Sequence, residues 1–175
     1  MRAVALLRGV NVGGVRFAMK DLAAALEVAG AEDVRTVLAS GNVLLTTRHE
    51  APAQVSDLIS RVIRERFGFD VGVVTASLPT VRAAAEGYPF ARAEDRHAYV
   101  VLADRQGVLD ELIGDGDAAD PDVEQLRAGA GVLYWDAPKG ATLTTRFGVL
   151  LGRRQRQGVV TTRNLRTLER LVATG

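Results

Sequence analysis

The chain has 175 residues, with 47% hydrophobic residues, 25% charged residues and a formal net charge of +1 at pH 7. This composition is typical of a globular protein with a proper core and excludes wholesale disorder, while the absence of cysteine excludes disulfides, thiolate metal sites and cysteine nucleophiles. Because the chain has neither a signal-peptide core nor an apolar run of the roughly 18 residues that a membrane span needs, we expect a cytoplasmic protein with no membrane partner.

The first 76 residues predict the element order β-α-β-β-α-β. Short apolar runs rich in β-branched residues predict strands, and apolar residues at helical spacing predict two helices, one ended by Gly30 and one opened by Pro52. A turn at Ser40-Gly41-Asn42 predicts a hairpin. The expected elements are strand 3–7, helix 19–29, strands 34–39 and 43–47, helix 52–67 and strand 69–76.

The rest of the chain predicts a looser repetition of this order. The expected elements are helix 78–86, strand 97–103, helix 106–113, a loop over 114–122, a hairpin of 123–127 and 132–135, and helices over 143–154 and 162–173 joined by an extended link at 158–160. We therefore expect an α+β fold of two ferredoxin-like (split βαβ) halves, the second with extra C-terminal helices. The first half takes residues 1–76, a connecting helix and linker takes 77–95, and the second half takes 96–175.

Charge is distributed unevenly along the second half. Residues 94–136 carry three basic and eleven acidic side chains, whereas residues 137–175 carry eight basic and one acidic. Such blocks pair within the chain as solvated faces, or they offer a basic face to an anionic partner. Both interpretations stay open.

The stretch LLRGVNVGG at residues 6–14 follows the first predicted strand, where phosphate-binding loops lie. The dinucleotide motif G-x-G-x-x-G is excluded because Asn11 stands at its third position, and the P-loop is excluded because no Lys-Ser/Thr pair follows Gly14. Backbone amides at Gly13 and Gly14, beside Arg8, predict a generic anion-binding nest. The alternative is that the glycines only permit positive φ in a crossover loop.

The predicted topology brings this loop to a second polar segment. In a β-α-β-β-α-β unit, the loop after the first strand and the turn between the second and third strands lie at one end of the sheet, and the third strand neighbours the first. We therefore expect Arg8, Asn11, Gly13 and Gly14 to lie near Ser40 and Asn42. Taken alone, the Ser40-Gly41-Asn42 turn is ordinary hairpin chemistry.

The C-terminal run TTRNLRTLERL is the other candidate. Thr161 or Thr162 would cap a helix whose first turn holds Arg163 and Asn164. A cation in that turn opposes the helix dipole, and residues placed against local preference are candidates for function. The alternative is that Arg163 pairs with a carboxylate of the acidic block.

No metal site, cofactor or catalytic group is identifiable. The chain has two histidines, and they do not stand at metal-ligand spacing. A G-x-S-x-G motif is missing, and GDGDAADPD lacks the glutamate that closes a calcium loop.

Four segments, LLRGVNVGG, VRTVLASGNVLL, IRERFGFDV and TTRNLRTLERL, together resemble in order and spacing the bacterial family called domain of unknown function 1697. The resemblance implies an α+β fold of two ferredoxin-like halves and implies no activity. The family-like positions are Arg8, Gly9, Asn11, Gly13, Gly14, Ser40, Gly41, Asn42, Arg163 and Asn164. The chain departs from the family at Leu165, where tryptophan is common, and at residues 141–143, where Ser-Lys-Leu is frequent and Lys139 is the nearby replacement.

The leading hypothesis is a site for a phosphate-bearing small ligand or nucleic acid. It is built from Arg8, Asn11, Gly13, Gly14, Ser40 and Asn42, joined by Arg163 and Asn164 from the second half. Arginine would supply bidentate contacts to the anion. The alternatives are a group-transfer or hydrolytic enzyme using the same pocket, and a protein-interaction module paired through its charged blocks. The sequence does not indicate an oligomeric state.

Overall fold

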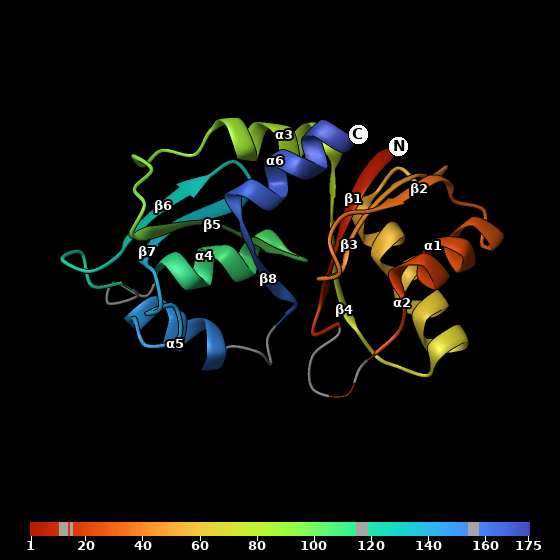
Figure 1. Cartoon of the computed structure of the whole chain (residues 1–175), viewed down its shortest axis with the longest axis horizontal. Helices are drawn as coiled ribbons and strands as arrows, with labels where there is room; N and C mark the ends of the chain where they lie inside the picture. Colours follow the sequence, from red (N-terminus) through yellow and green to blue (C-terminus); the bar gives the residue numbers. More distant parts are fainter. Residues whose placement is uncertain (11–13, 15, 115–118, 154–157) are drawn as a thin grey trace. The chain divides into compact units, whose positions relative to one another are not determined.

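The computed structural model describes residues 1–10, 14, 16–114, 119–153 and 158–175. The chain divides into two compact units. Unit 1 comprises Met1–Val81 and Glu169–Gly175, and unit 2 comprises Arg82–Leu168. Two four-stranded antiparallel sheets, accompanied by helices, make up the structure (Figure 1). The predicted α+β class and the arrangement in two halves are thereby confirmed.

Unit 1 has the predicted order of elements. They are β1 (Arg2–Arg8), α1 (Met19–Val28), β2 (Glu32–Thr36), β3 (Asn42–Thr46), α2 (Pro52–Phe67) and β4 (Gly72–Ser77), followed by α3 (Leu78–Glu86). The strand order in the sheet is β2-β3-β1-β4, so the third strand lies beside the first, as expected.

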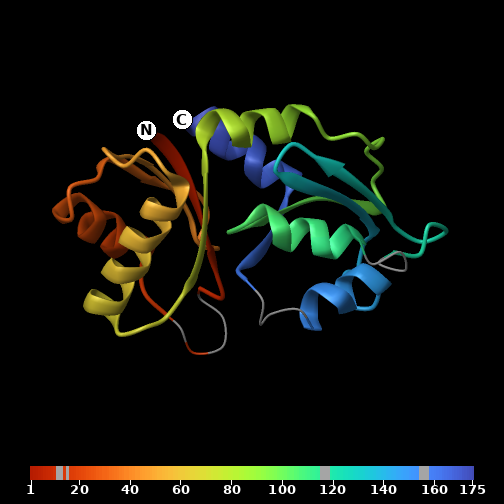
Figure 2. The same cartoon turned by 180° about the vertical axis from the view of Figure 1, so that it is seen from behind.

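Helices α1 and α2 cover one face of this sheet, which can be followed in Figure 2. Ala3, Ala5 and Leu7 of β1 pack into the core that the two helices close. The intervening residues Val4 and Leu6 are also fully buried, so both faces of β1 are covered. This explains why β1 is a continuous apolar run rather than an alternating one.

The hairpin of unit 1 differs from the expected one. Strand β2 ends at Thr36 instead of residue 39, and its pairing with β3 shifts between Glu32 and Arg35. Asp33, within this β-bulge, has φ +45°, and Leu38 in the following connection has φ +60°. The connection to β3 therefore spans residues 37–41 and is longer than a tight Gly-Asn turn.

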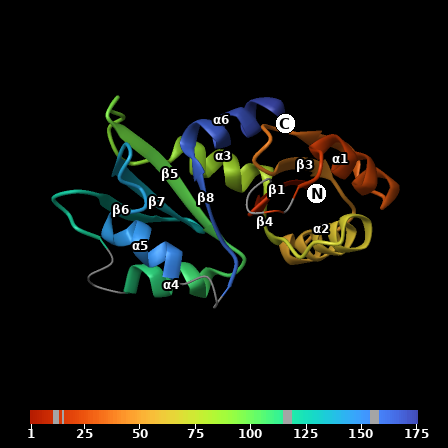
Figure 3. The same cartoon turned by 60° about the horizontal axis from the view of Figure 1, so that its bottom comes forward.

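Unit 2 contains the second sheet, with strand order β6-β7-β5-β8. Its elements are β5 (Arg96–Ala103), α4 (Gln106–Gly114), β6 (Gln125–Gly129), β7 (Val132–Pro138), α5 (Arg146–Arg153) and β8 (Val160–Asn164), and α6 (Leu165–Thr174) follows. Helices α4 and α5 lie on one face of this sheet (Figure 3). Their apolar residues pack around Trp135 and Phe147.

Strand β8 corrects the sequence prediction at the C-terminus. The predicted helix over 162–173 begins at Leu165, because Val160–Asn164 pairs with β5, with Arg163 opposite Val100. The β-branched run Val159–Thr162 favours this extended conformation. The second half therefore repeats the order β-α-β-β-α-β of the first, more closely than predicted.

Candidate functional site

The end of β1 carries the first predicted site residue. Arg8 closes the strand opposite Gly72 of β4, and its side chain is half-buried. Gly9 follows with φ +72°, and Val10 packs into the core of unit 1. The chain thus turns away at Gly9 in a conformation that glycine adopts without strain, which leaves Arg8 at the sheet end.

The Ser40-Gly41-Asn42 turn lies directly against this end of β1. The Leu7 amide donates a hydrogen bond of 2.7 Å to the carbonyl oxygen of Gly41, and Asn42 pairs with Leu6 in the sheet. Gly41 has φ +80°, and a Cβ atom there would lie 2.9 Å from Leu7 Cβ. A residue without a side chain is therefore required for this close approach.

Asn42 holds the turn in shape. Its side chain is fully buried, and Nδ2 donates hydrogen bonds to the carbonyl oxygen of Val37 at 2.8 Å and to Ser40 Oγ at 3.0 Å. Ser40 itself is exposed. The two residues therefore differ in place: Asn42 lies beneath the turn, and Ser40 lies on its surface.

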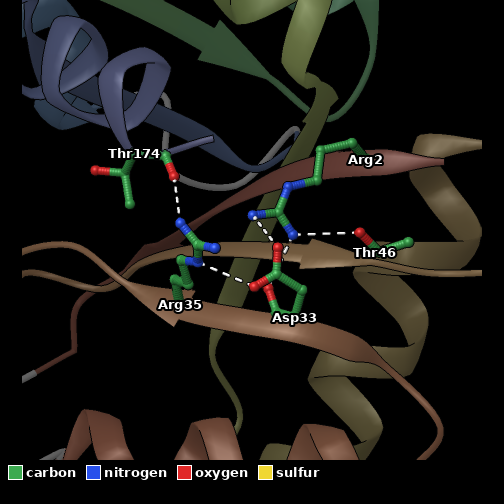
Figure 4. A network of polar contacts seen from close by, with 5 residues as sticks. All are labelled: Arg2, Asp33, Arg35, Thr46 and Thr174. Atoms are coloured by element: carbon green, nitrogen blue, oxygen red, sulfur yellow. Dashed lines mark hydrogen bonds and ion pairs between the residues drawn. The ribbon is translucent and has the colours of Figure 1, made fainter.

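The Arg8 guanidinium has no hydrogen-bond or ion-pair partner among the described residues. Arg2, at the opposite end of the same strand, donates to the Asp33 carbonyl oxygen and to Thr46 Oγ1 (Figure 4). Arg8 thus presents a positive charge at the sheet end that the described part of the fold does not neutralise.

Of the other predicted site residues in this loop, the structure describes only Gly14. Asn11 and Gly13 lie outside the described residues. Gly14 is exposed with φ +103°, and a Cβ atom there would have open space. Glycine is therefore favoured at position 14 by the positive φ, and not by a lack of space for a side chain.

Arg163 and Asn164 belong to unit 2, and neither stands in the first turn of a helix. Asn164 caps α6, because its Oδ1 accepts a hydrogen bond of 3.0 Å from the Arg166 amide; the predicted caps, Thr161 and Thr162, lie in β8. Arg163 Nη1 donates to Thr161 Oγ1 at 2.6 Å and to the Thr162 carbonyl oxygen at 3.1 Å. Burial lowers the pKa of Arg163 to about 10.

The sequence did not predict two buried carboxylates of unit 2. Glu124 accepts hydrogen bonds from Trp135 Nε1 at 2.8 Å and from the Phe147 amide at 2.9 Å, and so ties β7 to the start of α5. Asp136 pairs with Arg96 and accepts a hydrogen bond of 3.1 Å from the Tyr88 hydroxyl. Burial, followed by the charge of Asp136, raises the pKa of Tyr88.

One sequence signal could have identified Asp136 as a buried acid. It follows directly after Tyr134 and Trp135, both of which are buried. Both carboxylates are satisfied by structural partners. Within the ranges that the structure describes, no group of three or more His, Cys, Asp or Glu side chains is placed to hold a metal ion. No helix among those same residues is long and apolar enough to cross a membrane.

Comparisons with known proteins agree with the fold. The structure of a conserved bacterial protein, SP0830 from Streptococcus pneumoniae, is similar with a TM-score of 0.80 and 23% identity over 99% of this chain and 97% of that one. No curated protein matches the chain. Residues 1–134 match the family described as protein of unknown function (DUF1697). The chain therefore belongs to the DUF1697 family, for which that description gives no activity.

Proposed function

We propose that unit 1 binds the phosphate group of a small anionic ligand at the end of β1, where Arg8 meets the Ser40-Gly41-Asn42 turn. We call this place the polar corner. The observation that carries the proposal is the guanidinium of Arg8, which has no partner among the described residues. This group is a planar fork of donors that matches phosphate oxygens in pairs. A half-buried charge interacts with an anion more strongly than an exposed one, because water screens it less.

The neighbouring groups support the same ligand. Ser40 offers a hydroxyl on the surface of the turn, and the backbone amides around Gly13 and Gly14 would add donors of the kind that form an anion nest. Asn42 serves as a positioning residue in this proposal, because its side chain is buried beneath the turn. Asn11 completes the set on the sequence argument.

Arg163 and Asn164 carry less weight in this proposal. Asn164 caps α6 and Arg163 is hydrogen-bonded within β8, so both have structural roles. The polar corner of unit 1 is therefore proposed to bind phosphate by itself.

The test is titration of inorganic phosphate, followed by calorimetry and by backbone amide shifts. We expect saturable shifts at Leu7, Gly14 and Gly41. Arg8→Gln should weaken binding about tenfold or more, because a hydrogen bond to a charged group contributes about 1.5–3 kcal/mol. Arg8→Lys should be intermediate, since the charge stays and the fork is lost.

Arg48→Gln is the matched control, because Arg48 is exposed and follows the other end of β3. Equal binding by the Arg8→Gln and Arg48→Gln variants would refute the proposal. A single-stranded oligonucleotide provides a further arm. If it binds more tightly than phosphate and its affinity falls steeply with salt, the ligand is nucleic acid rather than a small molecule.

A further inference from the structure

Unit 1 has a groove of about 720 Å³ between α1 and α2 that the phosphate proposal does not use. Its volume lies within the range of small-molecule sites, roughly 300–1,000 Å³. Six of its nine lining residues are apolar, and three of these six are alanines. The lining residues are Asp21, Ala24, Ala25, Val28, Ala29, Val62, Glu65, Arg66 and Phe67.

The sequence of α1 explains why this space is left open. Leu22 and Leu26 point into the core and are fully buried. The groove side of the helix carries Ala24 and Ala25, and Ala29 follows directly after the helix. Alanine side chains are too short to fill the space against α2. Val28, at the end of α1, is 91% exposed, so an apolar surface faces solvent beside the groove.

One residue of the groove lining, Phe67, is aromatic, and two further rings lie beside it. Phe67 ends α2, and its ring stacks on that of Phe17 with centroids 4.6 Å apart and planes at 18°. Phe69 lies close by, 6.4 Å from Phe17 between ring centroids. All three rings are half-buried, so they retain exposed surface. Such surfaces stack on planar rings of a ligand.

Phe67 lies near the end of the sheet that carries the polar corner. Arg8 pairs with Gly72, and Phe67 precedes Gly72 by five residues. Paired Cα atoms lie about 5 Å apart and five residues span at most about 18 Å, so the Cα atoms of Phe67 and Arg8 lie within roughly 23 Å of each other. One nucleotide held between these two side chains is compatible with this bound.

Polar groups of the groove indicate which part of a ligand it takes. The carboxylates of Asp21 and Glu65 accept hydrogen bonds and repel anions, and Arg66 adds one positive charge. The groove therefore disfavours phosphate itself and favours a neutral planar group that carries amino or hydroxyl donors. A nucleoside has this chemistry, since carboxylates commonly accept hydrogen bonds from ribose hydroxyls.

We propose that the α1–α2 groove binds the nucleoside part of a nucleotide whose phosphate occupies the polar corner. The base stacks against Phe67, and Asp21 and Glu65 accept hydrogen bonds from the sugar or the base. This inference rests on the proposed phosphate site for one half of the ligand. The other half rests on the groove alone.

The experiment titrates the whole chain with AMP, adenosine and inorganic phosphate by calorimetry. We expect AMP to bind about tenfold or more tightly than phosphate, because the free energy of stacking a base on an aromatic ring corresponds to about that factor in affinity. Ala24→Phe fills the groove from an exposed helical position. It should lower AMP affinity to that of phosphate and leave phosphate binding unchanged. Asp21→Asn should weaken AMP and adenosine about equally.

Ala53→Phe is the matched control, because Ala53 is exposed on α2 and does not line the groove. Equal affinity of AMP and phosphate, or equal effects of Ala24→Phe and Ala53→Phe, would overturn the groove proposal and leave the polar corner standing. Adenosine binding that Ala24→Phe abolishes, without phosphate binding that depends on Arg8, supports the groove and overturns the corner. Absence of all binding overturns both.

Discussion

Strand β1 begins and ends with arginine, and the two residues have opposite surroundings. At Arg2, Nη1 donates to the Asp33 carbonyl oxygen at 2.8 Å and to Thr46 Oγ1 at 3.2 Å, and Nη2 lies 3.1 Å from Asp33 Oδ2. Arg8 has no such partner in the described part of the chain. The same residue type in one strand thus serves the fold at one end and has no described partner at the other.

The Arg2 end is occupied because the edge strand needs support there. Asp33 has positive φ within the bulge of β2, a costly conformation for a residue other than glycine. Arg35 also pairs with this carboxylate at 2.9 Å and donates to the Thr174 carbonyl oxygen at 2.8 Å (Figure 4). Two arginines therefore hold one strained acidic residue and the last turn of α6 in unit 1.

The largest expected effect tests whether the turn at the Arg8 end of β1 depends on close packing, as the other end of the strand depends on the Arg2 network. Gly41→Ala should lower the free energy of unfolding by about 3 kcal/mol, because positive φ strains alanine and its Cβ would overlap Leu7. Urea unfolding measures the loss. Gly30→Ala is the control, since Gly30 has φ +90° but open space, and it should lose about 1 kcal/mol. Equal losses would mean that the close approach to Leu7 is not required.

The next effect concerns the Arg2 network itself. Arg2→Met should lower the free energy of unfolding by about 1.5 kcal/mol, because the hydrogen bonds to Asp33 and Thr46 disappear and the bulge loses a partner. The loss stays moderate because the Asp33 side chain is 51% exposed and water solvates it. Urea unfolding at low and high salt measures both contributions. A loss below 0.5 kcal/mol would show, on the scale of ordinary surface substitutions, that the network is not structural.

A smaller effect concerns unit 2, where the carboxylate of Asp136 has partners, as Arg2 has in unit 1. Tyr88→Phe should cost about 1 kcal/mol at pH 7, because Asp136 loses one hydrogen bond and keeps Arg96. The pKa of Tyr88 is raised by burial and by Asp136, so its contribution is present below the unfolded pKa of about 10 and is lost as the pH rises above it. The wild-type protein should therefore lose stability more steeply than the variant above pH 10. Parallel pH profiles would contradict this assignment.

Local patterns in the sequence predicted the order of the elements of unit 1 and the order of its strands. Strand order follows from the β-α-β-β-α-β succession, and Leu7 and Gly41 meet accordingly. The bulge at Asp33 was not predictable, because a distant partner, Arg2, stabilises its positive φ. Strand β8 was missed because a short extended run before an amphipathic helix resembles a helix start until its pairing with β5 is known.

The residues of the candidate site were likewise predictable from the sequence only in part. The residue types Gly41 and Asn42 predicted the turn. They did not indicate that Asn42 is buried and shapes the turn, whereas Ser40 is exposed. Burial depends on tertiary packing, which a local pattern does not encode. The groove between α1 and α2 was missed for a related reason. Alanines at helical spacing predict close packing, and only the positions of the two helices show that space remains.

The smallest expected effect on stability is the most informative for function. Arg8→Met should change the free energy of unfolding by no more than about 0.5 kcal/mol, because the guanidinium has no partner to lose among the described residues. The same substitution at Arg2 is the matched comparison, at the other end of the same strand. Urea unfolding without phosphate measures both variants. If Arg8→Met costs as much as Arg2→Met, Arg8 serves the fold and the polar corner loses its ligand-binding charge. If Arg8→Met leaves stability unchanged and abolishes the stabilisation that added phosphate gives the wild type, the charge is held for a ligand.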